Sequence, residues 1–173
     1  MRLMRAFSGL RPLRRGVCAC AVRVDHAGGV MGAAAVAARR ANPGDVLMTI
    51  RESDAEVRTE PSKFTIHIGR GRHLYAESVM RMNHSFEPTI RLELPAQHTD
   101  DADALLVLVA DREIEPGDPI TFDYNTTEWE MAEPFACAGT GRQVRGFKHL
   151  SAPEREAMLG RALPHIRERA GRG

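Results

Sequence analysis

Arg-Met-Asn-His-Ser-Phe-Glu-Pro at residues 81–88 and Ile-Thr-Phe-Asp-Tyr-Asn at residues 120–125 are the two stretches that decide the fold of this chain. Each has an ordinary explanation when taken alone. Asn and Ser side chains bond to nearby backbone, so the first stretch reads as a turn. β-Branched and aromatic residues dominate the second stretch, which reads as a half-buried strand. The pair is more informative, because both stretches occur in one order with similar turns around them.

Three further segments surround the two stretches. A Glu-Pro-Gly-Asp turn at residues 115–118 precedes the second stretch, and a Pro-Gly-Asp turn at residues 43–45 is of the same kind. Gly-Arg-Gly-Arg-His-Leu at residues 69–74 precedes the first stretch. Taken together, residues 32–146 resemble the SET-domain family of protein lysine methyltransferases. In that family the two stretches pass each other as a pseudoknot.

The resemblance implies a mainly β fold, the SET-domain fold of small curved sheets with a pseudoknot, followed by a short C-terminal helix. The apolar pattern agrees. Apolar and polar residues alternate at residues 64–68 and 90–94, as in half-buried strands, and residues 104–110 are continuously apolar, as in a buried strand. Ser151 and Glu154 form a capping-box pattern that predicts the start of a helix, and Pro164 is expected to kink or end it.

The 173 residues are most simply one domain, long enough to bury a substantial core. We divide the chain into a basic leader at residues 1–24, a SET-like domain at 25–130, a post-SET-like segment at 131–150, and a C-terminal helix and tail at 151–173. The leader holds six Arg and no acidic residue. This composition is typical both of a disordered leader and of an organelle transit peptide.

The chemistry of lysine methylation sets the requirements of the site. A neutral ε-amine attacks a methyl group in line, but free lysine is mostly protonated at neutral pH, so an apolar channel must lower its pKa. The resemblance implies S-adenosylmethionine as the methyl donor. It also implies that Tyr124 is the catalytic residue, whose hydroxyl aligns the donor and the amine. The cofactor-binding residues that the same resemblance implies are Gly32, Ala34, Arg81, Asn83 and His84.

The Gly-rich element of the family is altered in this chain. The family has Gly-x-Gly, whereas Gly32 is followed here by Ala33 and Ala34. Small residues are needed because the backbone approaches the donor closely. If the second position requires a positive φ, Ala34 is strained, and we expect Ala34→Gly to tighten donor binding.

Four aromatic residues are candidates for binding the substrate lysine, namely Phe86, Phe122, Trp129 and Phe135. Phe122 lies two residues before Tyr124, where family members have either Phe or Tyr. The resemblance implies that Phe leaves room for more than one methyl addition. Trp129 and Phe135 either wall the channel or pack in the core.

Many family members bind zinc through cysteines that follow the tyrosine. This chain keeps Cys137, but Gly139 and Val144 stand at the second and third ligand positions, and Phe86 stands at the fourth. One thiolate does not make a tetrahedral site. We therefore predict no metal. We expect the post-SET-like segment to close the channel by packing, with Phe86 in part of the former metal volume.

Charge is unevenly distributed along the chain. Residues 77–133 hold fourteen acidic residues and three Arg, a net charge of −11. Such a run commonly serves solubility, but it also attracts cationic partners and disfavours phosphates. We expect a basic, lysine-bearing protein or peptide as the substrate, such as a histone tail, and no direct nucleic acid.

Composition also bounds the location of the protein. No apolar run approaches the roughly twenty residues that a membrane-spanning helix needs. Three cysteines do not indicate a disulfide framework, so a reducing compartment is favoured. We expect an intracellular protein of the nucleus or cytoplasm, or of an organelle if the leader is a transit peptide.

Three functions are compatible with these patterns. The first is a protein-lysine N-methyltransferase that uses S-adenosylmethionine, which Asn83, His84 and Tyr124 favour. The second is a weakly active or inactive SET-like binding module, which Ala34 and the missing cysteines favour. The third is a β-rich interaction protein without a donor site, which adjacency of the two stretches in a structure would reject.

Overall fold

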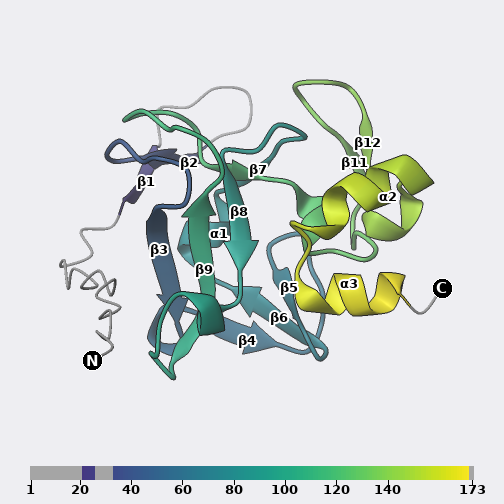
Figure 1. The fold of residues 1–173 in the computed structure, drawn as a ribbon, viewed down its shortest axis with the longest axis horizontal. Coiled ribbons are helices and arrows are strands. Elements are labelled where there is room, and N and C mark those ends of the chain that lie inside the picture. The colour runs from purple at the N-terminus through teal and green to yellow at the C-terminus, as the bar shows by residue number, and fades with distance from the viewer. Residues whose placement is uncertain (1–20, 26–32, 172–173) are drawn as a thin grey trace, which may run out of the picture.

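The computed structural model describes residues 21–25 and 33–171 (Figure 1). Short strands form five small sheets in this part of the chain, and the fold is mainly β as the resemblance implied. The sheets contain β1 (Val22–Asp25) and β2 (Ala34–Ala37); β3 (Val46–Arg51), β9 (Ala104–Ala110) and β8 (Ile90–Glu93); β4 (Glu56–Arg58), β6 (Arg72–Tyr75) and β5 (Ile66–Gly69); β7 (Asn83–His84) and β10 (Thr121–Phe122); β11 (Phe135–Ala136) and β12 (Gln143–Val144).

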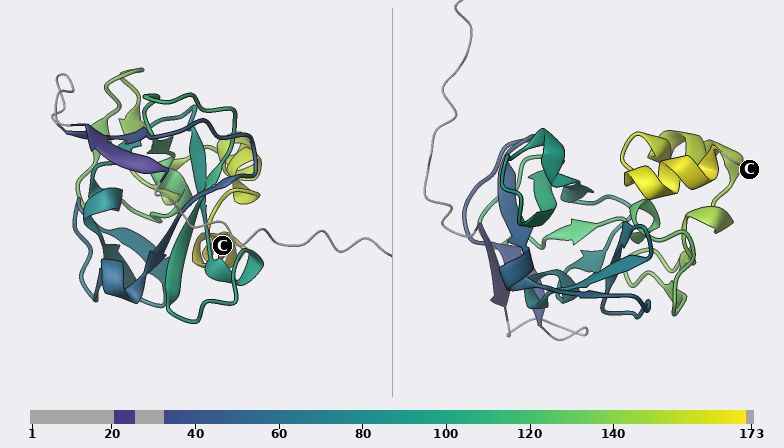
Figure 2. Two further views of the ribbon diagram at one scale, coloured as in Figure 1. Left: turned by 90° about the vertical axis from the view of Figure 1, so that its left-hand side faces the viewer. Right: turned by 90° about the horizontal axis from the view of Figure 1, so that it is seen from below.

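The described residues also contain three α-helices and several 3-10 turns, and two of the helices follow the last strand. The helices are α1 (Glu77–Met80), α2 (Ala152–Leu159) and α3 (Pro164–Ala170), and the 3-10 turns are Glu52–Asp54, Pro95–Gln97, Tyr124–Thr126 and Phe147–His149. Helices α2 and α3 lie together at the end of the molecule away from β1 and β2 (Figures 1 and 2).

The main core forms around β9, the central strand of the antiparallel sheet β3-β9-β8. Residues 105–110 are all buried, because this strand has the continuous apolar run that burial on both faces requires. The alternation at residues 90–94 places Ile90 and Leu92 in the same core. Burial of this kind contributes about 1.5–3 kcal/mol for each large apolar side chain.

Strands β7 and β10 bring the two decisive stretches together. They pair in parallel, with Asn83 opposite Thr121 and His84 opposite Phe122. The main-chain N–H of Ser85 donates to the carbonyl oxygen of Phe122 at 3.1 Å. The two stretches therefore lie side by side, as the pseudoknot arrangement requires. This adjacency argues against a β-rich protein with an unrelated fold.

Strand β2 joins the same assembly. The main-chain N–H of Ala35 donates to the carbonyl oxygen of Arg81 at 2.9 Å, and the N–H of Ile120 donates to the carbonyl oxygen of Ala35 at 2.9 Å. The segment after Gly32 thus contacts both decisive stretches through main-chain hydrogen bonds. Gly32 itself lies outside the described residues, as do residues 1–20 of the leader; residues 22–24 of that leader belong to β1.

The C-terminal region differs from the expected single helix. Ser151 and Glu154 form the predicted capping box at the start of α2. Pro164, however, neither kinks nor ends this helix, which stops at Leu159. It occupies the first turn of a second helix, α3, where the missing N–H of proline costs nothing. The two helices pack over a small second core that contains Phe147, Ala162 and Ile166.

Candidate functional site

Tyr124 is the first residue of a 3-10 turn, and Asp123 separates it from the end of β10. Its hydroxyl donates a 2.6 Å hydrogen bond to the carbonyl oxygen of Met82, and its main-chain N–H donates to Nδ1 of His84 at 3.2 Å. Burial raises the pKa of Tyr124 to about 12, so the phenol stays protonated at neutral pH. The side chain borders two cavities.

The first cavity has a volume of about 460 Å³ and is lined by Asn83, His84, Tyr124, Phe135 and Cys137, among others. This volume is in the range of small-molecule sites, and the wall mixes aromatic and polar groups as such sites do. Asn83 and His84 reach it because β7 ends beside Tyr124. The rings of His84 and Phe135 lie 5.9 Å apart, edge to face.

His84 is held neutral in this wall. Burial, together with the smaller effect of the positive charge of Arg142, lowers its pKa to about 4. Since Nδ1 accepts the N–H of Tyr124, the ring proton is on Nε2, and the carboxylate of Asp123 at 3.6 Å from Nδ1 makes no ion pair. Nε2 is buried without a hydrogen-bond partner within the described residues. An unpaired buried donor of this kind is available to a ligand.

Ala34 and Arg81 are not part of that wall. Ala34 pairs with Asp25 in the β1–β2 sheet, and Arg81 contacts β2 through its carbonyl oxygen. Nε of Arg81 is a second buried donor without a partner in the described part of the chain. The expectation of strain at Ala34 is wrong. Arg70 is the one described non-glycine residue with a positive φ, so the φ of Ala34 is not positive. Ala34 has ordinary strand geometry, so Ala34→Gly has no strain to relieve.

The second cavity is narrow, with a volume of about 30 Å³, enough for a water molecule or an amine. Phe122, Tyr124, Glu128 and Met131 contribute to its wall. Phe122 is only 3% exposed, and its ring centre lies 4.7 Å from that of Tyr124. Phe122 therefore lies beside Tyr124 in the wall of this cavity, and its role in binding lysine stays a prediction. The sequence analysis did not single out Glu128, because its place in this wall depends on the packing of distant segments.

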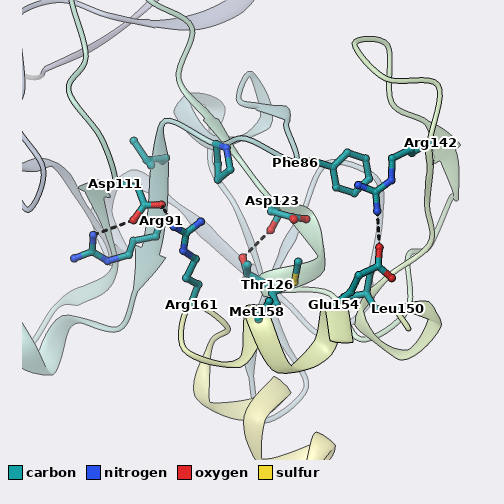
Figure 3. Close-up of a pocket in the computed structure, with 13 residues that line it drawn as sticks. Phe86, Arg91, Asp111, Asp123, Thr126, Arg142, Leu150, Glu154, Met158 and Arg161 are labelled. Atoms are coloured by element: carbon teal, nitrogen blue, oxygen red, sulfur yellow. Dashed lines mark hydrogen bonds and ion pairs between the residues drawn. The ribbon is translucent and has the colours of Figure 1, made fainter. Parts of the chain in front are cut away.

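Phe86 and Trp129 lie elsewhere. Phe86 lines a third cavity of about 230 Å³ that Tyr124 does not border (Figure 3). Trp129 stacks on Phe147 with ring centres 5.8 Å apart, and the guanidinium of Arg169 lies 4.6 Å from its ring centre. Neither residue is in the wall of the narrow cavity. Trp129 packs against the second core, one of the two roles expected for it, and the substrate-binding role of Phe86 stays a prediction. Phe135 lines the first cavity instead of the narrow one.

The third cavity shows which contacts hold the post-SET-like segment in a chain that lacks three of the four zinc-ligand cysteines. The guanidinium of Arg142 lies 4.0 Å from the ring centre of Phe86 and also pairs with Glu154 of α2 at 2.5 Å (Figure 3). Arg142 thus links the segment after Cys137 to the first decisive stretch and to the C-terminal helices. Cation–π contacts of this kind stabilise by about 0.5–2 kcal/mol.

Cys137 is buried and forms no disulfide. Within residues 21–25 and 33–171, no three His, Cys, Asp or Glu side chains form a group suited to a metal ion. Gly139 lies in a turn and Val144 is buried in β12. The prediction that the protein contains no zinc stays a prediction.

Comparison with known proteins agrees with this geometry. The SET domain family model matches residues 32–125, and the chain belongs to the SET domain family. A crystal structure of a Plasmodium falciparum protein described as a "putative histone methyltransferase" is similar in fold, with a TM-score of 0.47 and 13% identity over 60% of this chain and 91% of that one. A search of curated proteins found no match. No helix in the described residues is long and apolar enough to cross a membrane.

Proposed function

We propose that this protein is an S-adenosylmethionine-dependent protein-lysine N-methyltransferase. The observation that carries the proposal is the position of Tyr124, which borders both a cavity large enough for a donor and a narrow cavity large enough for an amine. Membership of the SET domain family supports the same class of reaction. The alternative is a SET-like module that binds but does not transfer.

The first cavity fits the donor by size and by its groups. S-Adenosylmethionine carries acceptor atoms on its carboxylate, ribose and adenine, and the buried N–H of His84 Nε2 lacks an acceptor. Asn83 and His84 would hold the donor, and the ring of Phe135 would pack against its flat adenine ring. Arg81 does not border this cavity, so no direct contact with the donor is proposed for it. When bound, the donor supplies an electrophilic methyl group on a sulfonium.

The narrow cavity would receive the lysine side chain. The side chains of Phe122 and Met131 form an apolar part of its wall, which favours the neutral amine once the lysine has lost its proton. Phe122 offers no hydroxyl to hold the amine in one orientation. A methylated amine could therefore turn for a second transfer.

Tyr124 would align the two reactants. Its hydroxyl is fixed by the carbonyl oxygen of Met82, at the place where both cavities meet its ring. A phenol with a raised pKa cannot act as a base at neutral pH, so its role is to position the amine and the methyl group and to exclude water. The acidic character of residues 77–133 favours a basic protein substrate, such as a histone tail.

The test combines donor binding with turnover. Calorimetry with S-adenosylmethionine should show binding close to one donor per chain. Incubation with donor carrying a labelled methyl group and a core histone mixture should place label on lysine. Donor binding without any label on protein would favour the SET-like binding module. The absence of donor binding would overturn both the methyltransferase and the binding module.

A further inference from the structure

Glu128 is a carboxylate in the wall of the narrow cavity, beside Phe122 and Tyr124. One carboxylate oxygen, Oε1, accepts the main-chain N–H of His67 at 2.8 Å and the hydroxyl of Thr127 at 3.2 Å. These two bonds hold the carboxylate in place against β5. Within the described residues, Glu128 forms no ion pair with Lys or Arg, in contrast to the exposed Glu130, which pairs with Lys148 at 2.7 Å.

An uncompensated carboxylate in such a place is costly. Burial of a carboxylate disfavours its charged form, and a buried charge is ordinarily paired. Burial raises the pKa of Glu128 to about 7, although the hydrogen bonds from His67 and Thr127 favour the charged form. The group that would compensate the negative charge of Glu128 is a cation. The cavity that Glu128 borders is the one into which we have placed the substrate lysine.

We propose that Glu128 binds the ε-ammonium group of the substrate lysine and accepts its proton before methyl transfer. This inference rests on the proposed function and adds a second catalytic residue to it. The lysine loses one N–H proton to a carboxylate oxygen and becomes a neutral amine. The nitrogen lone pair then forms the new N–C bond while the C–S bond of the donor breaks, leaving a neutral thioether. Glu128 releases its proton to solvent as the product leaves.

The surroundings of Glu128 contain other groups that carry or accept charge. Two lie on the cavity wall and three lie behind the carboxylate, on β5, β6 and α3. They are Lys63 and Tyr124 on the wall, and His67, His73 and His165 behind it. Lys63 pairs with the exposed Glu133 at 3.4 Å rather than with Glu128.

A purely structural role for Glu128 makes a different prediction. If the carboxylate served only to hold β5 through the N–H of His67, Glu128→Gln would preserve function, because the amide oxygen of Gln accepts the same hydrogen bond. Glu128→Gln therefore separates the two roles while keeping the shape of the side chain. Glu130→Gln is the matched control, since it removes one negative charge two residues away on an exposed side chain.

The experiment measures kcat and KM for label transfer to histones between pH 5.5 and 9, for the wild type and both variants. We expect the wild-type rate to fall below about pH 7. Glu128→Gln should lose roughly 100-fold in rate, the usual size of a general-base contribution, together with this acidic limb. Glu130→Gln should behave as the wild type. A wild-type rate and pH profile in Glu128→Gln would overturn the proposal.

A binding measurement keeps the test independent of turnover. n-Butylammonium copies the end of a lysine side chain, and its binding is followed by NMR titration in the presence of S-adenosylhomocysteine. We expect binding to the wild type and to Glu130→Gln, and at least tenfold weaker binding to Glu128→Gln. If none of the three proteins, the wild type included, transfers label, the proposed function fails. Weaker binding of n-butylammonium to Glu128→Gln alone would still identify Glu128 as a cation site. Equal binding by all three proteins would refute the cation site.

Discussion

The hydroxyl of Tyr124 donates a 2.6 Å hydrogen bond to the main-chain carbonyl oxygen of Met82, which lies 42 residues earlier in the chain. Met82 directly precedes Asn83, so this bond ties the second decisive stretch to the first. Because a carbonyl oxygen of the backbone cannot rotate away, it fixes the hydroxyl more firmly than a side chain would. The predicted catalytic group is thus oriented before any ligand arrives.

The first prediction concerns Tyr124→Phe. We expect transfer to fall by roughly 100-fold or more, because the hydroxyl no longer aligns the reactants. Stability should fall by about 1–3 kcal/mol, since the carbonyl oxygen of Met82 loses its partner. Label transfer and thermal unfolding measure the two effects. Transfer close to the wild-type rate would remove Tyr124 from the mechanism.

The second prediction concerns the number of methyl groups added. Phe122 is buried beside Tyr124 in a cavity of about 30 Å³, so the hydroxyl of Phe122→Tyr would take up scarce space there. That hydroxyl would also bond the amine or its water, at about 0.5–1.5 kcal/mol. This energy biases successive transfers by up to roughly tenfold toward monomethyl product. Mass spectrometry over time is the test, and a wild-type protein that stops at monomethyl-lysine would contradict the argument.

The third prediction concerns Gly146, which follows β12. Its φ is 103°, and an added Cβ would lie 2.6 Å from Cα of Glu130 and 2.7 Å from the carbonyl oxygen of Trp129. Gly146→Ala should therefore lower the free energy of unfolding by more than about 3 kcal/mol, from strain and overpacking together. Denaturant unfolding measures this change. Gly139→Ala is the control, because a Cβ there meets nothing within 4 Å and its effect should be small.

The fourth prediction concerns the cluster of His67, His73 and His165. The rings of His67 and His73 stack at 4.6 Å, His165 lies 4.1 Å from His67, and Nε2 of His67 is buried without a partner in the described residues. Burial, together with the smaller effects of the neighbouring charges of His165, His73 and Arg169, lowers the pKa of His67 to about 4. The unfolded chain therefore binds a proton more readily than the folded protein does.

The sign of the effect follows from that difference. The contribution of His67 to stability is present above pH 6.5 and is lost as the pH falls from 6.5 to about 4. Its size is on the order of 2 kcal/mol after allowance for partial exposure to solvent. His67→Phe keeps the stacking and cannot titrate, so its unfolding free energy should fall less over this range. Glu128 also titrates in this range and changes the stability with the opposite sign, but it does so equally in the wild type and in His67→Phe. The difference between the two curves of unfolding free energy against pH therefore reports His67 alone. Parallel curves would contradict the prediction.

The fifth prediction is that the purified protein holds no stoichiometric zinc and that chelators leave its melting temperature unchanged. The reason is that Gly139, Val144 and Phe86 stand at the positions where the resemblance implies cysteines, and the guanidinium of Arg142 packs on the ring of Phe86. Arg142→Ala should instead lower the melting temperature, because the link to Phe86 and Glu154 is lost. Elemental analysis checks the metal content. One zinc per chain would refute this account of the segment.

Sequence alone determined the features that depend on local pattern and on characteristic motifs. The apolar run at residues 104–110 predicted the buried strand β9, because a strand covered on both faces has no polar position. The capping box at Ser151 predicted the start of α2. The motif residues Asn83, His84 and Tyr124 were found in the same way. Pro164 was misread, because proline at the first turn of a new helix and proline at the end of an old one look alike in sequence.

Tertiary structure alone decided which side chains share a cavity. Trp129 follows Tyr124 closely in sequence, yet it packs on Phe147 in the second core, whereas Glu128, its immediate neighbour, borders the narrow cavity. Adjacent residues at a turn point in different directions, and only the packing of distant segments determines what each one meets. The same holds for the unpaired Nε2 of His84, because a missing partner is a property of the surroundings. Local pattern specifies backbone and burial, but the chemistry of a site depends on long-range contacts that no short stretch contains.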